Sequence, residues 1–404
     1  MTYGIKLTLL CSALLACSSC LATEELVIWE DVGRSFGIQR AARNFSARHG
    51  VTVTVKERSS VEHLSKVENY INTNDTSDLP DVFIINSDRI GEAVNKDIIA
   101  PVNFMKQDSS LYEQSAIDTL TYNGKIYASP RSMETLVVYY NKDLLEYPYE
   151  HIEDYEDLGN KLKRKGLYGL IGKFDLFYFG YGFIAAQDAY IFGKDEHGNY
   201  NAHDIGLDSK NAKQGVKTLV DYASKYVPDE VMKADSTAIL DELFTKGKAA
   251  AVINGSWALE TYAESGVNYG VAPLPRLANG NFMTPFFGIK GYVITKKSKH
   301  KELAEEFIRY INTPINAMFR YGLIAELPPI KDVLNNPLII NDDFANAITT
   351  QLKHTQPMPY IAEMGNVWTP MSNAIYSAIK GEINSDEAVD KAVTEIKQTL
   401  PISE

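Results

Sequence analysis

The chain has 404 residues, of which 45% are hydrophobic and 23% are charged. This is the composition of an ordinary soluble globular protein, and the length is comfortable for two hydrophobic cores. The formal net charge of −12 argues against nucleic acid or an anionic membrane surface as a partner.

Residues 1–22 have the pattern of a secretory signal peptide. Lys6 is followed by a short apolar run and then by small residues up to Ala22. The run is too short to span a bilayer, so we expect a soluble, periplasmic mature protein that begins after Ala22.

The chain has three cysteines, all within this leader: Cys11, Cys17 and Cys20. The mature chain would therefore hold no disulfide and no thiolate metal site. The residues before Cys17 also resemble a lipobox, so a protein anchored through a lipid on Cys17 is the alternative.

Strands and helices alternate at the start of the mature chain. Apolar, β-branched runs and helical spacing predict strands at 26–29, 51–55 and 81–85 and helices at 35–49 and 61–71. This β-α-β-α-β order implies a mostly parallel, doubly wound sheet. Ligands bind outside the carboxyl ends of strands in such sheets, so the loops after the first and third strands should meet at one rim.

Residues 123–145 look like a connection between two lobes. A turn at Asn123-Gly124 leads into a short strand that Pro130 ends, and a polar segment at 131–134 precedes a second strand. In this interpretation Glu134 is a lone carboxylate that faces a cleft. An ordinary hairpin with a surface glutamate is the alternative, and these residues alone favour neither.

The later sequence predicts a helix-rich second half. Ser256 and Ser385 are predicted N-caps of helices. The Asn- and Gly-rich segment 277–285 and the break at Thr313-Pro314 are candidates for two further crossings. Helices are expected at 155–165, 211–226, 239–246, 302–311, 315–321, 344–354, 367–379 and 385–399, and strands at 249–253, 269–272 and 291–294.

Sequence motifs of common enzymes are absent. The chain has no G-x-S-x-G, H-E-x-x-H or Walker motif, and its seven histidines form no spaced cluster. We therefore expect no catalysis, no metal and no cofactor. An exported glycoside hydrolase that uses Glu134 with Asp88 or Asp175 is the alternative, although an acidic chain offers many such carboxylate pairs.

Charged residues follow two of the predicted strands. Asp88 and Arg89 follow the third strand, where they could together accept from and donate to vicinal hydroxyls. Arg34, in the loop after the first strand, could add a second donor. A helix N-cap at Asp88 and solvated arginines are the structural alternatives.

Aromatic residues suggest a sugar platform. Trp257 and Trp368 each begin a predicted helix, and Tyr178 and Tyr181 lie in an aromatic run at 174–183. An indole or phenol face suits the C–H surface of a pyranose ring, whereas core packing is the alternative for each residue. An export signal, two lobes, aromatic and charged residues and no catalytic motif together indicate a sugar-binding protein.

The sequence resembles the maltose-binding proteins and the wider family of extracellular solute-binding proteins that serve ABC sugar importers. The resemblance covers nearly the whole mature chain, and its stretches occur in order and at matching spacing. These stretches are residues 26–29, 80–91, 123–145, 249–257, 268–275, 301–308 and 358–368.

This resemblance implies an α/β fold of the type II periplasmic binding protein kind. Two doubly wound lobes would be joined by three crossings, near 131–134, 281–287 and 312–316, and would close over a sugar. The N-terminal lobe would comprise residues 23–131 and 283–314, and the C-terminal lobe residues 132–282 and 315–404. The partners implied are an oligosaccharide and an inner-membrane ABC permease, with the binding protein itself a monomer.

The resemblance also implies roles for single residues. Sugar hydroxyls would bond to four charged residues, Arg34, Asp88, Arg89 and Glu134. Sugar rings would stack on three aromatic residues, Tyr178, Trp257 and Trp368. Arg131 stands where the family usually has an apolar residue, and a salt bridge to Glu134 is the only role we expect for it.

Several positions depart from the maltose-binding pattern. Gly33 replaces an acid, Ile85 replaces a tryptophan, and Leu176 replaces a second pocket glutamate for which the adjacent Asp175 could substitute. Thr369 and Ser372 replace a tyrosine and an arginine. Each lost hydrogen bond to a ligand costs on the order of 1 kcal/mol, so these changes could switch the preferred sugar.

Overall fold

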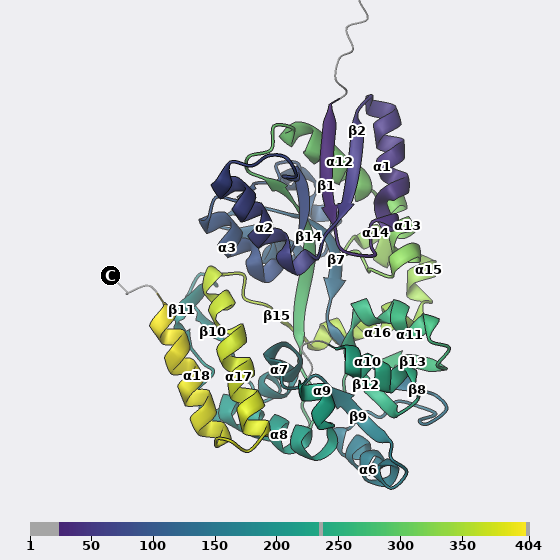
Figure 1. The fold of residues 1–404 in the computed structure, drawn as a ribbon, viewed down its shortest axis with the longest axis vertical. Helices are drawn as coiled ribbons and strands as arrows, with labels where there is room; N and C mark the ends of the chain where they lie inside the picture. Colours follow the sequence, from purple (N-terminus) through teal and green to yellow (C-terminus); the bar gives the residue numbers. More distant parts are fainter. Residues whose placement is uncertain (1–23, 234–236, 401–404) are drawn as a thin grey trace, which may run out of the picture.

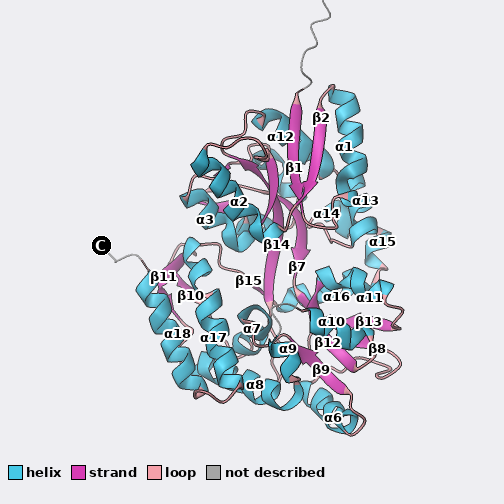
Figure 2. Cartoon of the chain, in the orientation of Figure 1, coloured by secondary structure: helices cyan, strands magenta, loops and turns pink. Residues whose placement is uncertain are grey.

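The structure is a computed structural model that describes residues 24–233 and 237–400. The expected signal peptide and the alternative lipid site at Cys17 lie outside the described residues. The chain forms two α/β lobes, one above the other in Figure 1, and each is built on its own sheet, drawn in magenta in Figure 2.

The first lobe has the predicted doubly wound sheet. Strand order is β15-β14-β3-β1-β2, with β1 parallel to both β2 and β3. The strands are β1 (Glu25–Glu30), β2 (Thr52–Glu57), β3 (Val82–Asn86), β14 (Phe286–Thr295) and β15 (Gln356–Pro357). Helices α1 (Phe36–His49) and α2 (Ser60–Thr73) connect the first three strands, as the alternating pattern predicted.

The second lobe is organised around a four-stranded sheet in the order β13-β8-β12-β9. Its strands are β8 (Leu136–Asn141), β9 (Tyr168–Gly172), β12 (Ala249–Gly255) and β13 (Tyr269–Ala272). Every residue of β8 and β12 is buried, as expected for strands covered on both faces. Helices α17 (Trp368–Ile379) and α18 (Ser385–Thr399) pack against each other and against α8 (Lys210–Tyr226).

Shorter elements complete the described chain. The remaining α-helices are α3 (Ile90–Asn95), α4 (Met105–Asp108), α5 (Gln114–Thr119), α6 (Ile152–Lys163), α7 (Phe177–Ala185), α9 (Asp229–Lys233), α10 (Ala238–Thr245), α11 (Leu259–Glu264), α12 (Lys301–Ile311), α13 (Pro314–Ile324), α14 (Lys331–Leu334), α15 (Pro337–Ile340) and α16 (Asp343–Gln351). The remaining strands are β4 (Ile99–Ala100), β5 (Thr121–Tyr122), β6 (Lys125–Ile126), β7 (Ser129–Glu134), β10 (Phe192–Lys194) and β11 (Tyr200–Ile205). The 3₁₀ turns named below are η1 (Ser87–Arg89), η3 (Ser256–Ala258) and η5 (Ala362–Asn366).

The polar segment at 131–134 is a strand rather than a crossing. It belongs to β7, which pairs antiparallel with β14, so the two strands form a ribbon that reaches the second lobe (Figure 1). Pro130 does not end a strand as predicted. It lies inside β7, where the register shifts and Arg131 becomes the unpaired residue of a bulge. A proline is tolerated at a bulge because the ladder there does not need its missing N–H.

The first crossing shrinks to Thr135, between β7 and β8. Its hydroxyl donates to the carbonyl oxygen of Phe286 at 2.9 Å, so it is tied to the start of β14. Thr284, just before β14, donates its backbone N–H to Gly182 of the second lobe at 3.1 Å. The chain just before β14 therefore contacts the second lobe, and the position of the second crossing within 281–287 stays a prediction.

The third crossing lies later in the chain than residues 312–316. Helix α13, which the expected division assigns to the C-terminal lobe, packs against α1 of the first lobe. The Arg40 guanidinium lies 3.7 Å from the centre of the Phe319 ring, and α16 is the next long helix to pack on β8 and β13. Apart from this helix, the division of the chain into lobes stays a prediction.

Two predicted caps are wrong. Ser256 begins η3 and makes no capping bond, because the chain enters α11 through a 3₁₀ turn. Helix α18 is capped by the side chain of Asn384, which accepts from the backbone of Asp386, so Ser385 is its first residue instead.

Candidate functional site

Arg34 connects the rim of the first sheet to the second lobe. It follows β1, and its Nη1 lies 2.8 Å from Glu260 Oε2 on α11. Its Nη2 donates to the carbonyl oxygen of Trp257 at 3.3 Å. The arginine predicted to donate to a sugar therefore joins the two lobes at Trp257, inside η3.

Three predicted aromatic residues come together at the same junction. The Tyr178 ring lies 6.0 Å from Trp257 and 6.3 Å from Trp368, measured between ring centroids. Phe286, at the start of β14, joins them at 5.9 Å from Tyr178. These four residues are called the aromatic cluster below.

Exposure separates the three predicted rings of the aromatic cluster from ordinary core, whereas Phe286, the fourth member, is buried. Trp29, the third tryptophan, is fully buried, whereas Trp257, Trp368 and Tyr178 each keep part of their surface accessible. Tyr181 is a core residue, since it is buried and stacks on Phe286 with ring centroids 3.9 Å apart.

Asp88 and Arg89 do not act as a pair. Arg89, at the end of η1, turns toward Glu92 of the following helix α3, with Nε and Nη2 at 2.7 and 2.6 Å from its Oε2. Asp88 is buried and accepts a hydrogen bond from the Trp368 side chain. Burial raises the pKa of Asp88 to about 6 despite the opposing attraction of Arg89. Asp88 therefore reaches the aromatic cluster without its neighbour.

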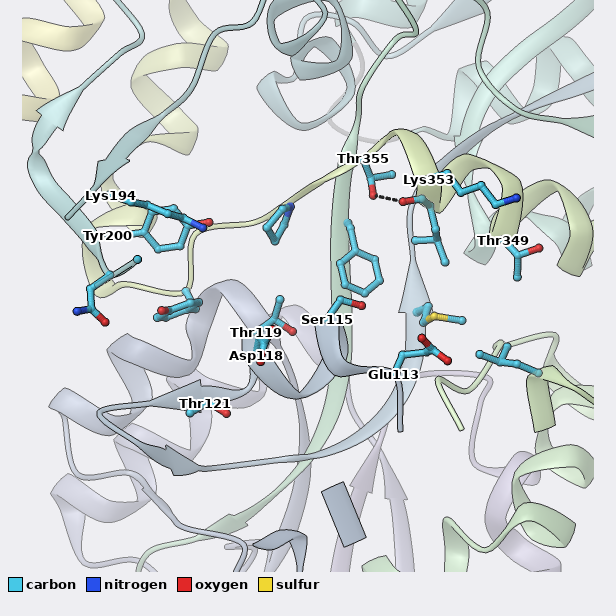
Figure 3. Close-up of a pocket in the computed structure, with 18 of the residues that line it drawn as sticks. Glu113, Ser115, Asp118, Thr119, Thr121, Lys194, Tyr200, Thr349, Lys353 and Thr355 are labelled. Carbon is cyan, nitrogen blue, oxygen red and sulfur yellow. Dashed lines mark hydrogen bonds between the residues drawn. The ribbon is translucent and has the colours of Figure 1, made fainter. Parts of the chain in front are cut away.

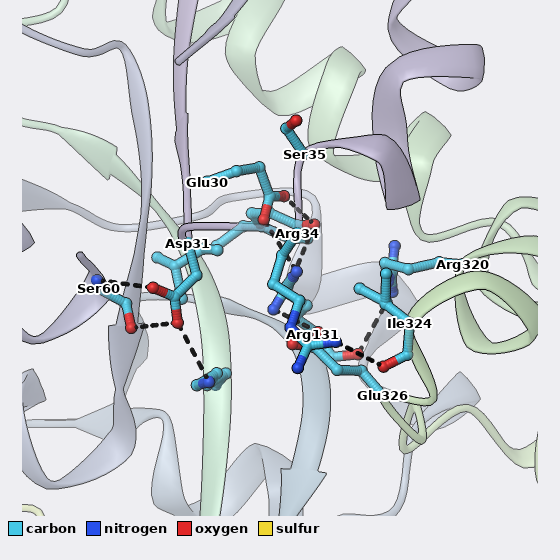
Figure 4. Close-up of polar contacts among 12 residues, drawn as sticks. Glu30, Asp31, Arg34, Ser35, Ser60, Arg131, Arg320, Ile324 and Glu326 are labelled. Carbon is cyan, nitrogen blue, oxygen red and sulfur yellow. Dashed lines mark hydrogen bonds and ion pairs between the residues drawn. The ribbon is translucent and has the colours of Figure 1, made fainter. Parts of the chain in front are cut away.

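Glu134 is paired with a residue that the sequence analysis did not select. Lys290 Nζ lies 2.9 Å from Glu134 Oε1 and 3.6 Å from Asp31 Oδ2. Asp31 is itself fixed by Ser60, whose backbone N–H and hydroxyl donate at 3.0 and 2.6 Å (Figure 4). The signal for Lys290 was available, because it is the single charged residue in an otherwise apolar strand.

Arg131 does not pair with Glu134. It is fully buried, with Nη2 2.8 Å from Glu30 Oε2, and it also pairs with Glu326 through Nη1 (Figure 4). Tyr292 accepts from Arg131 Nε at 3.0 Å and donates to Glu30 at 2.8 Å. The bulge in β7 thus places Arg131 among two carboxylates behind the candidate site.

Asp175 has a structural role in this arrangement. Lys173 Nζ lies 2.6 Å from its Oδ2, and both side chains are nearly inaccessible. Burial raises the pKa of Asp175, although Lys173 opposes this. Ser372, one of the departures from the maltose-binding pattern, accepts from the Phe177 backbone at 3.0 Å and so fixes the start of α7.

A separate pocket of about 840 Å³ lies on the other face of the β7–β14 ribbon (Figure 3). Met133 and Phe287 line it, and they alternate along their strands with Glu134 and Phe286, which point the opposite way. Both lobes contribute to its wall, for example through Glu113 and Lys353. It contains none of the predicted site residues, so we place the candidate site at the aromatic cluster, where the charged residues of both lobes converge.

Two classes of feature were also searched for within the described ranges. No group of three or more His, Cys, Asp or Glu side chains in residues 24–233 and 237–400 could hold a metal ion. In the same ranges, no helix has the length and apolar character needed to cross a membrane.

Comparison with known proteins identifies the family. A profile described as bacterial extracellular solute-binding protein matches residues 40–347. The galactooligosaccharide-binding protein of Bacillus subtilis (strain 168) is 33% identical over 377 residues, which cover 92% of this chain and 89% of that protein. The maltooligosaccharide ABC transporter solute-binding lipoprotein of Streptococcus pneumoniae (strain ATCC BAA-255 / R6) is 29% identical, covering 93% and 89%.

A solved structure agrees with these relatives. The maltose-binding periplasmic protein MalE from Listeria monocytogenes, in complex with maltose, superposes with a TM-score of 0.80 at 32% identity, covering 94% of this chain and 99% of that chain. This family and these proteins are named for binding and not for catalysis. The chain belongs to the bacterial extracellular solute-binding proteins.

Proposed function

We propose that the chain is the exported binding component of an ABC importer and captures a neutral oligosaccharide between its two lobes. The observation that carries this proposal is the meeting of three partly accessible rings of the second lobe, Tyr178, Trp257 and Trp368, with carboxylates of the first sheet. Asp88 accepts from the Trp368 side chain, and Glu134 lies on the face of the β7–β14 ribbon that carries Phe286. Aromatic faces suit sugar rings, and carboxylates accept hydrogen bonds from hydroxyls. The names of the relatives, which bind maltooligosaccharides or galactooligosaccharides, support the same class of ligand.

The proposed roles follow the placement of the residues. Trp257, Trp368 and Tyr178 stack on sugar rings, and Glu134 and Asp88 accept from hydroxyls. Arg34 joins the two lobes through its ion pair with Glu260. Arg89 and Asp175 pair with Glu92 and Lys173 and do not contact the sugar. A sugar that touches both lobes favours the state in which they are joined, and an inner-membrane permease recognises that state.

Calorimetric titration of the mature protein tests this proposal. Maltotetraose and galactotriose are the two probes, and at least one should bind with micromolar affinity, about −8 kcal/mol. Trp257→Ala should weaken binding at least tenfold. Tyr147→Ala, at a tyrosine that is 70% exposed, is the matched control and should bind as tightly as the unaltered protein. If neither sugar produced a heat of binding, the proposal would be overturned.

We propose further that the chain does not catalyse hydrolysis. The glycoside hydrolase alternative uses Glu134 with Asp88 or Asp175, and each of these carboxylates already has a protein partner. Glu134 pairs with Lys290, Asp175 pairs with Lys173, and Asp88 accepts from the Trp368 side chain. Prolonged incubation with maltotetraose followed by product analysis is the test. Turnover that disappears in Glu134→Gln would establish the hydrolase instead.

The mature form is proposed to be a monomer located in the periplasm and cleaved after Ala22. Lipid anchoring through Cys17 is the competing form, and the lipoprotein name of the pneumococcal relative favours it. The intact mass of the protein recovered from its native cell separates the two. A mass that begins at Thr23 supports periplasmic release, and a mass that includes Cys17 with acyl chains supports anchoring.

A further inference from the structure

Lys290 is placed unusually for a charged residue. It lies in the middle of β14, a ten-residue strand in which every residue is buried. A buried ammonium is costly unless it is paired, so its partners indicate why it is there. Burial acts to lower the pKa of Lys290, but attraction to Glu134, Glu326 and Asp31 outweighs burial and raises that pKa. The side chain is therefore a fixed positive charge.

The two nearest partners of Lys290 differ in how they are held. Asp31 accepts from the backbone N–H of Val32 at 3.0 Å and from Ser60 through both its backbone and its hydroxyl. Its carboxylate is therefore immobilised. Glu134 has Lys290 as its ion-pair partner among the described residues, at 2.9 Å, and its side chain keeps 13% of its surface exposed. Lys290 thus lies between an anchored carboxylate and one that remains accessible.

Glu134 faces the aromatic cluster. Side chains alternate along paired strands, so Glu134 shares a face with Lys290 and Phe286, opposite Met133 and Phe287. Asp88 accepts from the Trp368 side chain of the cluster. Burial raises the pKa of Tyr178, and the charges of Glu134 and Asp88 act in the same direction. The accessible oxygen of Glu134 can therefore meet a ligand that rests on the cluster.

We propose that Lys290 is a positioning residue that holds Glu134 in the orientation needed to accept a hydrogen bond from a ligand hydroxyl, with Asp31 as its anchor. This inference rests on the proposed oligosaccharide binding. Lys290 contributes to affinity through Glu134 rather than by touching the sugar. If the Glu134 side chain were free to rotate, ordering it on ligand binding would cost conformational entropy and so weaken the affinity.

A double-mutant cycle tests the inference, using whichever of maltotetraose and galactotriose binds the unaltered protein. Lys290→Met should weaken binding about 10- to 100-fold, the effect of losing a hydrogen bond to a charged group. In the Glu134→Gln background the same change should weaken binding by less than about threefold, because the residue through which Lys290 acts is already altered. A purely structural role would give equal losses in both backgrounds.

Two further variants keep the result interpretable. Lys296→Met removes a lysine just beyond β14 that pairs with Asp97 at the surface, and it should bind normally. Asp31→Asn removes the anchor without altering β14, so it serves if Lys290→Met fails to fold. Asp31→Asn should weaken sugar binding about three- to tenfold in the unaltered background. In the Glu134→Gln background the same substitution should have no effect on binding.

The outcomes separate the inference from the proposed function. Normal binding by both Lys290→Met and Asp31→Asn, or additive losses with Glu134→Gln, would overturn the positioning role and leave sugar binding intact. If the unaltered protein bound neither sugar, the proposed function would fail and the positioning role with it.

Discussion

Arg131 shows how a single residue links the ribbon to the first lobe. Its guanidinium is fully buried with Glu30 and Glu326, one from β1 and one from the segment after α13. Burying a guanidinium costs desolvation free energy that the ion pairs largely offset, so its main role is to fix the arrangement of the groups around it. Removing it leaves two buried carboxylates without their main cation.

Arg131→Met should therefore lower the free energy of unfolding by about 3–5 kcal/mol. Arg309→Met is the matched control, because Arg309 is 54% exposed and pairs with Asp108 at the surface. Its loss should be below about 1 kcal/mol. Urea unfolding at neutral pH measures both. Similar, small losses in the two variants would contradict the role assigned to Arg131.

Asp88 should make stability depend on pH. Burial raises its pKa to about 6, above the ordinary 3.8, so the folded protein binds this proton more tightly than the unfolded chain. The stabilising contribution is present below about pH 4 and is lost as the pH rises through about 6. Removing the charge should consequently help most at high pH.

The difference in free energy of unfolding between Asp88→Asn and the unaltered protein should change by about 3 kcal/mol in favour of the variant when the pH is raised from 4 to 7.5. Chemical unfolding at both pH values gives this difference. Asp97→Asn, whose side chain in the parent is 72% exposed, controls for the loss of one carboxylate. A difference that does not change with pH would show that Asp88 is not buried as described.

At the scale of elements, most of the fold could be predicted from local sequence. Continuous apolar runs identified β1, β3 and β12, because a strand that is covered on both faces is apolar throughout. Helical spacing of apolar residues identified the helices, because the buried face of a helix repeats with a fixed period. The ribbon could not be identified in this way. In the sequence alone, Pro130 indicates the end of a strand. It is allowed within β7 because of the bulge opposite Lys290 and Gly291, which depends on pairing with a strand far away in the chain.

The candidate site was predictable in part for the same reason. Trp257 and Trp368 could be chosen as aromatic residues at predicted helix starts and Tyr178 as part of an aromatic run, and the three do meet. The ion-pair partners of Glu134 and Arg131 could not be predicted, because Lys290, Glu30 and Glu326 all lie far from these two residues in the chain. Spacing carries no information on which carboxylate a distant cation reaches. Helix α13 was misplaced similarly, since its amphipathic pattern fits a contact with either lobe.

The contact between α3 and the segment before η5 is an element-scale feature that can be tested. A Cβ atom added at Gly91 would lie 2.5 Å from the carbonyl oxygen of Tyr360 and 2.9 Å from the nitrogen of Ala362. Gly91→Ala should destabilise the protein by about 1–3 kcal/mol, because backbone atoms must move apart. At Gly365, in η5, an added Cβ would meet nothing within 4 Å, so Gly365→Ala is the control. Equal thermal unfolding of both variants would contradict the close contact.

For the whole molecule, the pair of Arg34 and Glu260 should bias how the lobes sit. It joins the β1 loop to α11 at 2.8 Å, with Glu260 43% exposed at its side chain. A pair of this exposure contributes about 0.2–1 kcal/mol, enough to shift an equilibrium between joined and separated lobes up to about fivefold. Its removal should favour separation when no sugar is bound.

Glu260→Gln should thus increase the radius of gyration of the sugar-free protein in small-angle X-ray scattering. The difference should vanish with saturating sugar, since the ligand then holds both lobes. Glu264→Gln, on the same helix at an exposed position, is the control and should scatter like the unaltered protein. If the radius of gyration increased in Glu264→Gln, or did not increase in Glu260→Gln, the pair of Arg34 and Glu260 would not be a contact that joins the lobes.

The central claim is that an oligosaccharide binds at the junction of the lobes, where aromatic rings of the second lobe meet charged residues of the first sheet. A crystal structure with the tighter-binding of maltotetraose and galactotriose tests it most directly. We predict a sugar stacked on Trp257, Trp368 and Tyr178, with a hydroxyl bonded to Glu134. A sugar found instead in the pocket lined by Met133 and Phe287, on the other face of the ribbon, would contradict the account.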